Sequence, residues 1–96
     1  MIVSFKNRGT EDVYDGTDSK AARKVLPSRL HARAGRTLDQ LGAAVSLTSL
    51  SLPGLRLEKL KGDRIGQHSI RINDQYRVCF RWTEAGPEDV EIVDYH

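Results

Sequence analysis

Two stretches with a two-residue period constrain the fold of this chain more than any other feature of its sequence. In residues 68 to 72, and again in residues 76 to 82, apolar side chains alternate with polar ones, which is the pattern of a β-strand with one buried face. Residues 73 to 75, Asn-Asp-Gln, supply turn-forming side chains between the two stretches. The pattern predicts an antiparallel hairpin with one apolar face, and with Arg71 and Arg77 on its other face.

Before the hairpin, the sequence predicts one main helix. Pro27 suits the first turn of a helix, where its missing N–H costs nothing, and Ser28 provides a capping hydroxyl. From there apolar residues recur at steps of three and four, the spacing of one helical face. The members of this stripe are Leu30, Ala34, Leu38, Leu41 and Val45. We expect the helix to cover the apolar face of the sheet.

Three shorter segments complete the predicted sheet. Residues 2 to 5, 55 to 60 and 89 to 93 have strand-like composition, and a turn is expected at residues 85 to 88. Helices followed by antiparallel strands with short turns predict an α+β domain, in which an antiparallel-rich sheet packs on one face against N-terminal helices. With 96 residues the chain has room for one core, so we expect a single domain over residues 1 to 96.

Residues 7 to 24 carry a weaker signal than the rest of the chain. The segment is rich in charged residues and turn formers, and its large apolar residues up to position 24 are Val13 and Tyr14. One short helix held by these two side chains buries little apolar surface, so we expect a mobile segment here.

Composition excludes several classes of protein. The single cysteine, Cys79, cannot form an internal disulfide, and no His/Cys spacing suits a structural zinc site, so we expect neither metal nor cofactor. No apolar stretch approaches the roughly 20 residues of a membrane span, and the opening residues are too few for a secretory signal. We therefore expect a cytoplasmic protein without a membrane partner.

The net charge of +2 conceals a basic middle between two acidic ends. Residues 20 to 81 hold 13 Lys and Arg against 4 Asp and Glu, whereas residues 82 to 96 hold five acids and no Lys or Arg. Ten of the 15 cations are arginines, whose planar fork suits phosphate. A polyanion is the expected partner of the middle segment, although a solvated charged surface would give the same composition.

Strand parity sharpens this expectation. If the apolar positions of the hairpin face the helix, then Arg71, Arg77 and Arg81 project from the opposite face, and the same parity places Glu58 and Tyr95 there. An open sheet face with arginines, a tyrosine and a carboxylate is a plausible cradle for a nucleic-acid backbone. Solvent exposure alone would also place polar residues on it.

Several short motifs resemble the HigB-type toxins of bacterial toxin–antitoxin systems, within the RelE/ParE superfamily. The matching parts are Met1-Ile2 with Ser4-Phe5-Lys6, the loop Leu60-Lys61-Gly62-Asp63-Arg64-Ile65-Gly66, Ser69-Ile70, Tyr76-Arg77-Val78 and the closing Asp94-Tyr95-His96. The resemblance covers almost the whole chain and is weakest in residues 7 to 24. It implies a small α+β toxin that cleaves messenger RNA on the ribosome. It also implies opposition by a HigA-type antitoxin whose helix-turn-helix domain contacts operator DNA, so that the toxin reaches that DNA only through the antitoxin.

The resemblance assigns roles to the chain's own residues. In metal-free RNA cleavage the ribose 2'-hydroxyl attacks the adjacent phosphate, so the protein must hold the two in line, move protons and stabilise charge on the phosphoryl oxygens. We expect Arg77 to stabilise that charge and His96 to carry protons. Tyr95 would stack on a base or orient the phosphate, and Asp94 would fix the imidazole or the end of the strand. The expected contacts to the RNA backbone are Lys59, Lys61, Arg64, Arg71 and Arg81.

One position departs from the family pattern. Glu58 stands where some HigB members have a histidine, two residues before the Leu-Lys-Gly-Asp run. A carboxylate there can act as a base, but it also repels a phosphodiester. The departure weakens the expected nuclease activity and keeps a non-catalytic binding module as the alternative. That module would be either a ParE-like inhibitor of DNA gyrase or a weakened toxin that acts as co-repressor with its antitoxin.

Overall fold

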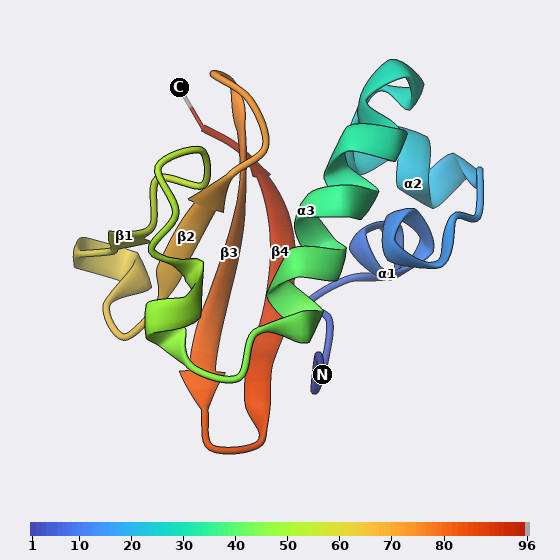
Figure 1. The fold of residues 1–96 in the computed structure, drawn as a ribbon. Coiled ribbons are helices and arrows are strands. Elements are labelled where there is room, and N and C mark those ends of the chain that lie inside the picture. The colour runs from blue at the N-terminus through green and yellow to red at the C-terminus, as the bar shows by residue number, and fades with distance from the viewer. Residues whose placement is uncertain (96) are drawn as a thin grey trace.

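The computed structural model of the protein describes residues 1–95 and has the α+β architecture that the sequence predicts. Its sheet has four antiparallel strands in the order β1-β2-β3-β4, and its helices precede the strands in the chain. Figure 1 shows α3 beside β4, with α1 and α2 beyond it. The helices are α1 (Arg8–Asp15), α2 (Lys20–Val25) and α3 (His31–Ala43), with short 3-10 turns η1 (Ser28–Leu30), η2 (Leu47–Leu50) and η3 (Gly62–Arg64). The strands are β1 (Glu58–Lys59), β2 (His68–Arg71), β3 (Tyr76–Thr83) and β4 (Gly86–Asp94).

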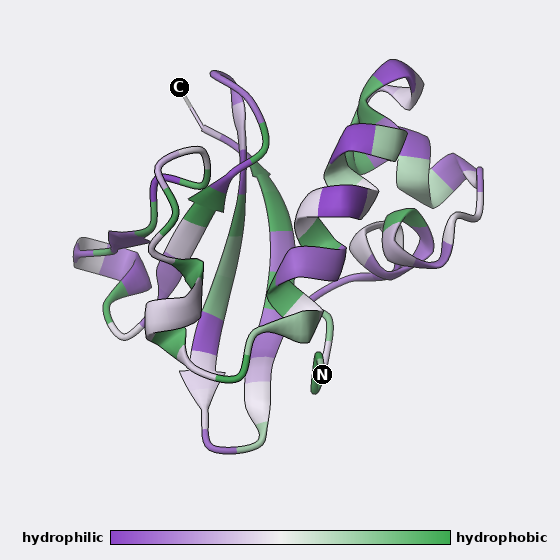
Figure 2. Cartoon of the chain, viewed as in Figure 1, coloured by the Kyte–Doolittle hydropathy of each residue, from purple (hydrophilic) through white to green (hydrophobic). Residues whose placement is uncertain are grey.

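The predicted hairpin is confirmed as β2 and β3. Ile70 pairs with Val78, and both side chains are fully buried, whereas the next pair, Arg71 and Arg77, is partly exposed. The side chain of Asn73 closes the turn, because its Oδ1 accepts hydrogen bonds from two backbone N–H groups. Figure 2 shows a hydrophobic middle of β3 with more hydrophilic residues on either side of it. The register follows from pairs in which both residues are buried or both are partly exposed.

The main helix is confirmed, but it is shorter than predicted at both ends. It begins at His31, after the 3-10 turn η1, and the expected capping hydrogen bond of Ser28 is not formed. Ala34, Leu38 and Leu41 of α3 are fully buried against the sheet. Val45, the last expected member of the stripe, is 91% exposed. Because the helix ends at Ala43, Val45 lies outside it, and the three- and four-residue spacing no longer places its side chain on the buried face.

The first expected strand is reduced to one bridge. Phe5 pairs in parallel with Val90 of β4, and the N–H of Val3 donates to the carbonyl of Pro87 at 2.7 Å. The start of the chain therefore runs along the outer edge of β4 and supplies part of the pairing that this edge needs.

Two further predictions, the strand at residues 55 to 60 and the turn at residues 85 to 88, need correction. The segment expected to be a strand from 55 to 60 contains only the two residues of β1, because Arg56 has a positive φ of 46° that interrupts the extended backbone. The turn expected at residues 85 to 88 is also shifted, since Gly86 and Pro87 already belong to β4.

Two helices, α1 and α2, occupy the segment for which one short helix was predicted. Polar side chains hold them: Asn7 caps α1, Ser19 caps α2, and the buried carboxylate of Asp12 accepts hydrogen bonds from Ser19 Oγ at 2.6 Å and Arg8 Nε at 3.1 Å. The hydroxyl of Thr10 accepts a hydrogen bond from the backbone N–H of Ile92 in β4. Helix capping and the hydrogen bonds of the buried Asp12 carboxylate thus stabilise α1 and α2, which bury little apolar surface. None of the helices in residues 1–95 has both the length and the apolar character needed to span a lipid bilayer.

We predict that Gly9→Ala destabilises the protein. A Cβ at Gly9 would lie 2.5 Å from the carbonyl oxygen of Ala21 and 2.7 Å from a methyl group of Val25, so α1 and α2 would have to separate. Overpacking of this kind costs about 1 to 3 kcal/mol of unfolding free energy, which corresponds to a Tm lower by about 4 °C or more. Gly35→Ala in α3 is the matched control, because no atom lies within 4 Å of its added Cβ. Equal melting temperatures of the two variants would contradict the prediction.

The expected mobility of residues 7 to 24 stays a prediction. Hydrogen exchange of the isolated protein measures it, and faster exchange of the α1 and α2 amides than of the α3 amides is the expected result. Protection equal to that of α3 would show that the two helices are as firmly ordered as the core.

Candidate functional site

The face of the sheet turned away from α3 carries the charged residues, and we call it the arginine face. The pairing register places Glu58 opposite Ser69, Ser69 opposite Cys79, and Arg71 opposite Arg77. Residues paired directly across antiparallel strands project from the same face. Parity therefore brings Glu58, Arg71 and Arg77 together, as the sequence predicts.

Arg77 is the most firmly held cation on this face. Its Nε donates to the hydroxyl of Ser69 at 2.7 Å, and its terminal nitrogen Nη2 donates to the carbonyl of Arg56 at 2.6 Å. Within residues 1–95 these acceptors are neutral, so hydrogen bonds fix the guanidinium without neutralising its charge. Nη2 also donates to the carbonyl of Ser69 at 3.4 Å, so among residues 1–95 the N–H donors of Nη1 stay available for an anion.

The C-terminal end of β4 brings Tyr95 to Arg77. The centre of the Tyr95 ring lies 5.7 Å from Cζ of Arg77, within the range of a cation–π contact. The backbone N–H of Tyr95 donates to the carbonyl of Gln75 at 2.6 Å, which fixes the end of the strand beside the β2–β3 turn. Tyr95 is 38% exposed, which leaves it accessible for stacking.

An open hollow of about 500 Å³ lies beside this pair of residues. Its lining consists of Glu58, Lys59, Leu60, Lys61 and Tyr95. The two lysines flank a single carboxylate, and Glu58, Lys59 and Lys61 are all exposed. Four of the residues predicted from the sequence thus border one cavity, on the side of the molecule where Arg77 lies.

Three other predicted contacts are engaged by neighbouring groups. Arg64 donates to Glu91 and to Gln67, both at 3.1 Å, and Arg71 forms an ion pair with Asp74 in the β2–β3 turn. Arg81 reaches the carbonyl of Gly66 over a long 3.5 Å contact. Their roles toward RNA stay predictions, and Arg64 and Arg71 would first have to share or release a carboxylate.

The two remaining predicted residues lie at the C-terminus. Both carboxylate oxygens of Asp94 accept from Nε2 of Gln75 at 3.3 Å, which ties the end of β4 to the β2–β3 turn. His96, the expected proton carrier, lies outside the described residues.

Two residues that sequence reasoning did not select prove central to the geometry. Ser69 is fully buried and provides the hydroxyl that holds Arg77, and its parity with Glu58 was the available signal. Arg56 contributes a backbone carbonyl that its left-handed conformation leaves pointing at Arg77. No sequence pattern predicts a left-handed conformation at a non-glycine residue such as Arg56.

Histidine and cysteine side chains of this region are shifted in pKa by burial. Burial lowers the pKa of His68, and the charge of Lys59 lowers it further, so this imidazole is neutral at pH 7. Burial raises the pKa of the Cys79 thiol despite the nearby Arg64, which favours the structural role expected for it. Within residues 1–95, no three His, Cys, Asp or Glu side chains gather in a way that could hold a metal ion.

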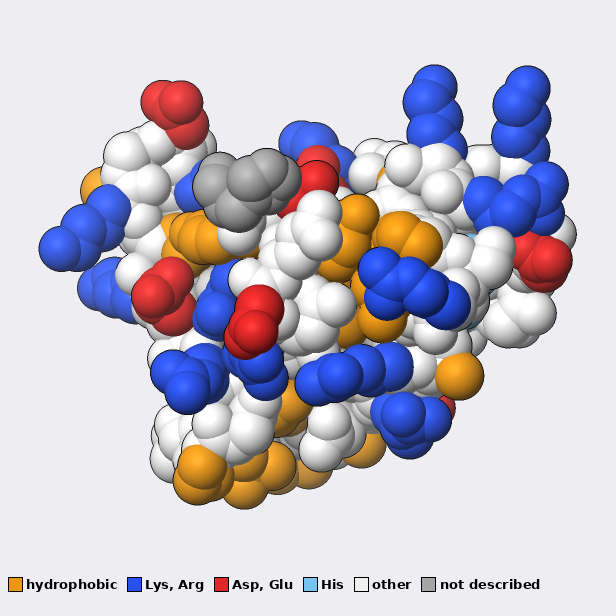
Figure 3. Space-filling view, turned by 90° about the horizontal axis from the view of Figure 1, so that it is seen from above, with side chains coloured by type: hydrophobic (Ala, Val, Ile, Leu, Met, Phe, Trp, Pro, Cys, Tyr) orange, Lys and Arg blue, Asp and Glu red, His pale blue; other side chains and the backbone are white. Residues whose placement is uncertain are grey.

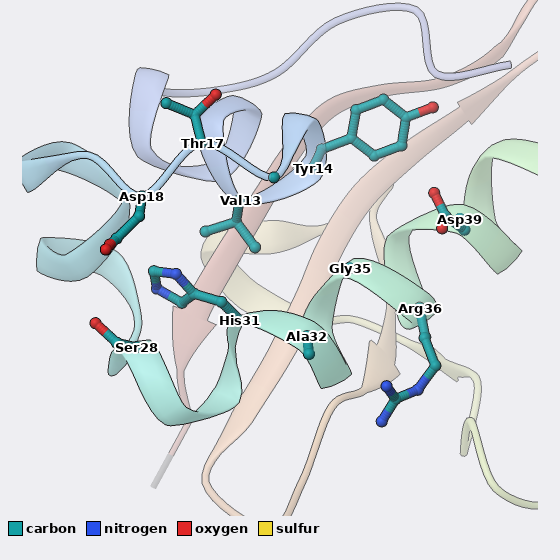
Figure 4. Close-up of a pocket in the computed structure, with 11 residues that line it drawn as sticks. Val13, Tyr14, Thr17, Asp18, Ser28, His31, Ala32, Gly35, Arg36 and Asp39 are labelled. Atoms are coloured by element: carbon teal, nitrogen blue, oxygen red, sulfur yellow. The ribbon is translucent and has the colours of Figure 1, made fainter.

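Another hollow, of about 450 Å³, lies between α1 and α3 (Figure 4). Val13 and Tyr14 border it from α1, while His31 and Asp39 border it from α3. The ring of His31 contacts the backbone carbonyl of Leu26 at 2.8 Å. None of the site residues predicted from the sequence lines this hollow, so it is separate from the arginine face.

Comparison with known proteins agrees with the fold. Residues 3–96 match the family described as RelE-like toxin of type II toxin-antitoxin system HigB. The chain is 38% identical over 86 residues to Toxin HigB-1 of Vibrio cholerae serotype O1, an alignment that covers 88% of this chain and 87% of that protein. It is 27% identical to Endoribonuclease HigB of Proteus vulgaris over 96 residues, with both chains fully covered. Among solved structures, the YoeB–YefM complex from Staphylococcus aureus contains a chain with a TM-score of 0.61 and 14% identity, covering 100% of this chain and 98% of that one.

These matches define the class first: a small RelE-like toxin of a type II toxin–antitoxin system. Within that class, the chain belongs to the HigB family, because the family match spans nearly its whole length. The resemblance expected from the sequence motifs is confirmed.

We predict that the Cys79 thiol is unreactive in the folded protein. The side chain is fully buried, and burial raises its pKa, so the thiol stays protonated at neutral pH and no reagent reaches it. Ellman's reagent at about pH 8 should label the protein only after denaturant is added. Stoichiometric labelling of the folded protein within minutes would contradict this, and Cys79→Ala provides the blank.

Proposed function

We propose that this HigB-family toxin is a cytoplasmic endoribonuclease that cleaves messenger RNA bound to the ribosome, and thereby inhibits translation and growth. A HigA-type antitoxin is its proposed neutralising partner, and operator DNA is reached only through that antitoxin. The observation that carries the proposal is the state of Arg77. Its guanidinium is fixed by the neutral acceptors Ser69 and Arg56, lies beside the ring of Tyr95, and keeps its charge for a phosphate.

This arrangement suits the transition state of RNA cleavage. The 2'-hydroxyl oxygen forms a bond to phosphorus while the bond from phosphorus to the 5' oxygen breaks, and the phosphoryl oxygens gain negative charge. A cation that is already oriented stabilises this charge without reorganising during the reaction. Arg77 fills that role, and the exposed part of Tyr95 provides a stacking surface for the neighbouring base.

The reaction also moves two protons. One leaves the attacking 2'-hydroxyl, and one reaches the departing 5' oxygen, so a base and an acid are needed. Glu58 is the proposed base, because it borders the hollow beside Tyr95, and His96 is the proposed acid. Lys59 and Lys61 line the same hollow, and their charges offset the repulsion between the Glu58 carboxylate and a phosphodiester. Because the nucleophile belongs to the RNA, the proposed reaction needs no metal.

Charge supports RNA as the substrate class. The basic middle of the chain supplies the arginine face and the lysines of the hollow, which is the electrostatic footprint of a protein that follows a phosphate backbone. Catalysis by one acid–base pair contributes only about 10²- to 10⁴-fold in rate. Positioning of the message by the ribosome would therefore have to supply much of the remainder.

The decisive experiment is cleavage of a defined message on purified ribosomes. We expect the native protein to cut it, Arg77→Ala to be about 10²- to 10³-fold slower, and Arg77→Lys to be nearly as slow because an ammonium cannot reproduce the fork. Removal of His96 should also slow cleavage. Arg23→Ala in α2, which loses an exposed ion pair with Asp18, is the matched control and should cut like the native protein.

Three outcomes would contradict the proposal: an intact message with the native protein, full activity of Arg77→Ala, or full activity without His96 and Tyr95. Inhibition of gyrase supercoiling without RNA breakage would favour the ParE-like alternative instead. Tighter operator binding by the antitoxin without growth arrest would favour the co-repressor.

A further inference from the structure

A second group of arginines lies outside the proposed catalytic set. Arg33 and Arg36 of α3 and Arg71 of β2 line an open hollow of about 390 Å³. Arg56 directly follows Leu55, another lining residue. We call this cavity the arginine hollow. Figure 3 shows Lys and Arg side chains gathered in a row across this end of the molecule.

The acidic side chain of Asp74 lies beside this group of arginines. The carboxylate of Asp74 is 97% exposed in the β2–β3 turn and forms an ion pair with Arg71. The hydrogen bond and charge of Arg71 lower the pKa of Asp74, and the charges of Arg56 and Arg33 lower it further. The Asp74 carboxylate therefore faces the guanidinium groups of Arg71, Arg56 and Arg33. Arg36 also borders the hollow between α1 and α3, as does Asp39. Among the described residues that line the arginine hollow itself, none is acidic, so its lining keeps a surplus of positive charge.

The members of the group have the chemistry of a phosphate site. All the cations are arginines, whose fork binds phosphate oxygens in pairs. Gln40 lines the same hollow and adds a side-chain amide donor, whereas the hydroxyl of Thr37 already donates to the Arg33 carbonyl at 3.3 Å. In the part of the chain that the structure describes, neither Arg33 nor Arg36 makes a side-chain hydrogen bond, so both are available to a ligand.

Arg71 links the hollow to the arginine face, because it is the last residue of β2 and its side chain also borders the hollow beside α3. Arg71 pairs directly with Arg77 across β2 and β3, and the loop carbonyl of Arg56 accepts a hydrogen bond from Arg77. A chain of phosphates held at Arg77 can therefore continue over Arg71 toward α3. An acidic protein segment could also neutralise these charges. RNA is the better candidate, because an RNA chain with its scissile phosphate at Arg77 would continue past Arg71 to the hollow.

We propose that the arginine hollow is a second RNA site, which binds the phosphodiester backbone away from the cleaved bond and in the free protein is partly occupied by the carboxylate of Asp74. This inference deepens the proposed function and rests on it for the nature of the ligand. The phosphates belong either to the message on both sides of the cut or to ribosomal RNA. Binding exchanges the Asp74 carboxylate for a phosphate on Arg71.

The test measures binding rather than cleavage. The probes are a fluorescent single-stranded 2'-O-methyl RNA oligonucleotide, which cannot be cut, and purified small ribosomal subunits. We expect the double variant Arg33→Ala/Arg36→Ala to bind about 5- to 20-fold more weakly and with a smaller salt dependence, because fewer counterions are released. Lys20→Ala/Lys24→Ala in α2 removes the same charge from exposed positions that do not line the hollow, and it should bind like the native protein.

A change of opposite sign keeps the test independent of folding defects. Asp74→Asn removes the competing carboxylate while keeping the shape of the turn, so it should bind RNA several-fold more tightly than the native protein. Melting curves confirm that each variant is folded. Weaker binding of the oligonucleotide by Arg33→Ala/Arg36→Ala assigns the phosphates to the message, whereas weaker binding of the ribosomal subunit alone assigns them to ribosomal RNA.

Other outcomes would overturn the inference. These are native affinity of Arg33→Ala/Arg36→Ala for both probes, unchanged or weaker binding by Asp74→Asn, or loss of antitoxin binding with unchanged RNA affinity, which would identify an acidic protein as the occupant.

Failure of the nuclease proposal and failure of the second RNA site give different results. If the native protein cuts no message but the double variant loses RNA affinity, the nuclease proposal fails and the hollow stands. If the message is cut but the double variant binds RNA normally, the reverse holds.

Discussion

The pairing of β2 with β3 is the constraint on which the rest of the structure depends. Ile70 and Val78 meet on the buried side of this pair, against α3. A slip of one residue would turn one strand over and bring its arginine, Arg71 or Arg77, into the core at a large desolvation cost. The same register that closes the core therefore builds the charged face, and stability and the proposed chemistry cannot be separated at these strands.

The arginines on this side of the molecule differ in how they are held. Arg64 and Arg71 are paired with carboxylates, whereas Arg77 is fixed by the Ser69 hydroxyl and the Arg56 carbonyl. Neutral acceptors orient a guanidinium without consuming its charge, so Arg77 is suited to a reaction in which negative charge develops. The ion-paired arginines are suited to reversible contacts, in which a phosphate replaces a carboxylate.

In the proposed nuclease, the arginine face would carry out the cleavage and the arginine hollow would bind the RNA away from the cut. A domain of this size has little room for a deep cavity that encloses a substrate, and both the hollow beside Tyr95 and the arginine hollow are open at the surface. Binding energy must come from many shallow contacts along an extended ligand. A track of arginines from the β2–β3 hairpin to α3 provides such contacts at a distance from the scissile bond, where they can position the RNA without contacting the reacting atoms.

The sequence by itself determined the hairpin, the stripe of α3 and the shared face of Glu58, Arg71 and Arg77, because each follows from a local period of two or of three to four residues. The tertiary structure alone decided that Ser69 and Arg56 hold Arg77, that Val45 leaves the core, and that Arg33 and Arg36 come beside Arg71. These outcomes depend on where a helix ends, on one left-handed residue in a loop, and on how distant segments pack. Such features arise from contacts between elements, and no repeating pattern within a single element encodes them.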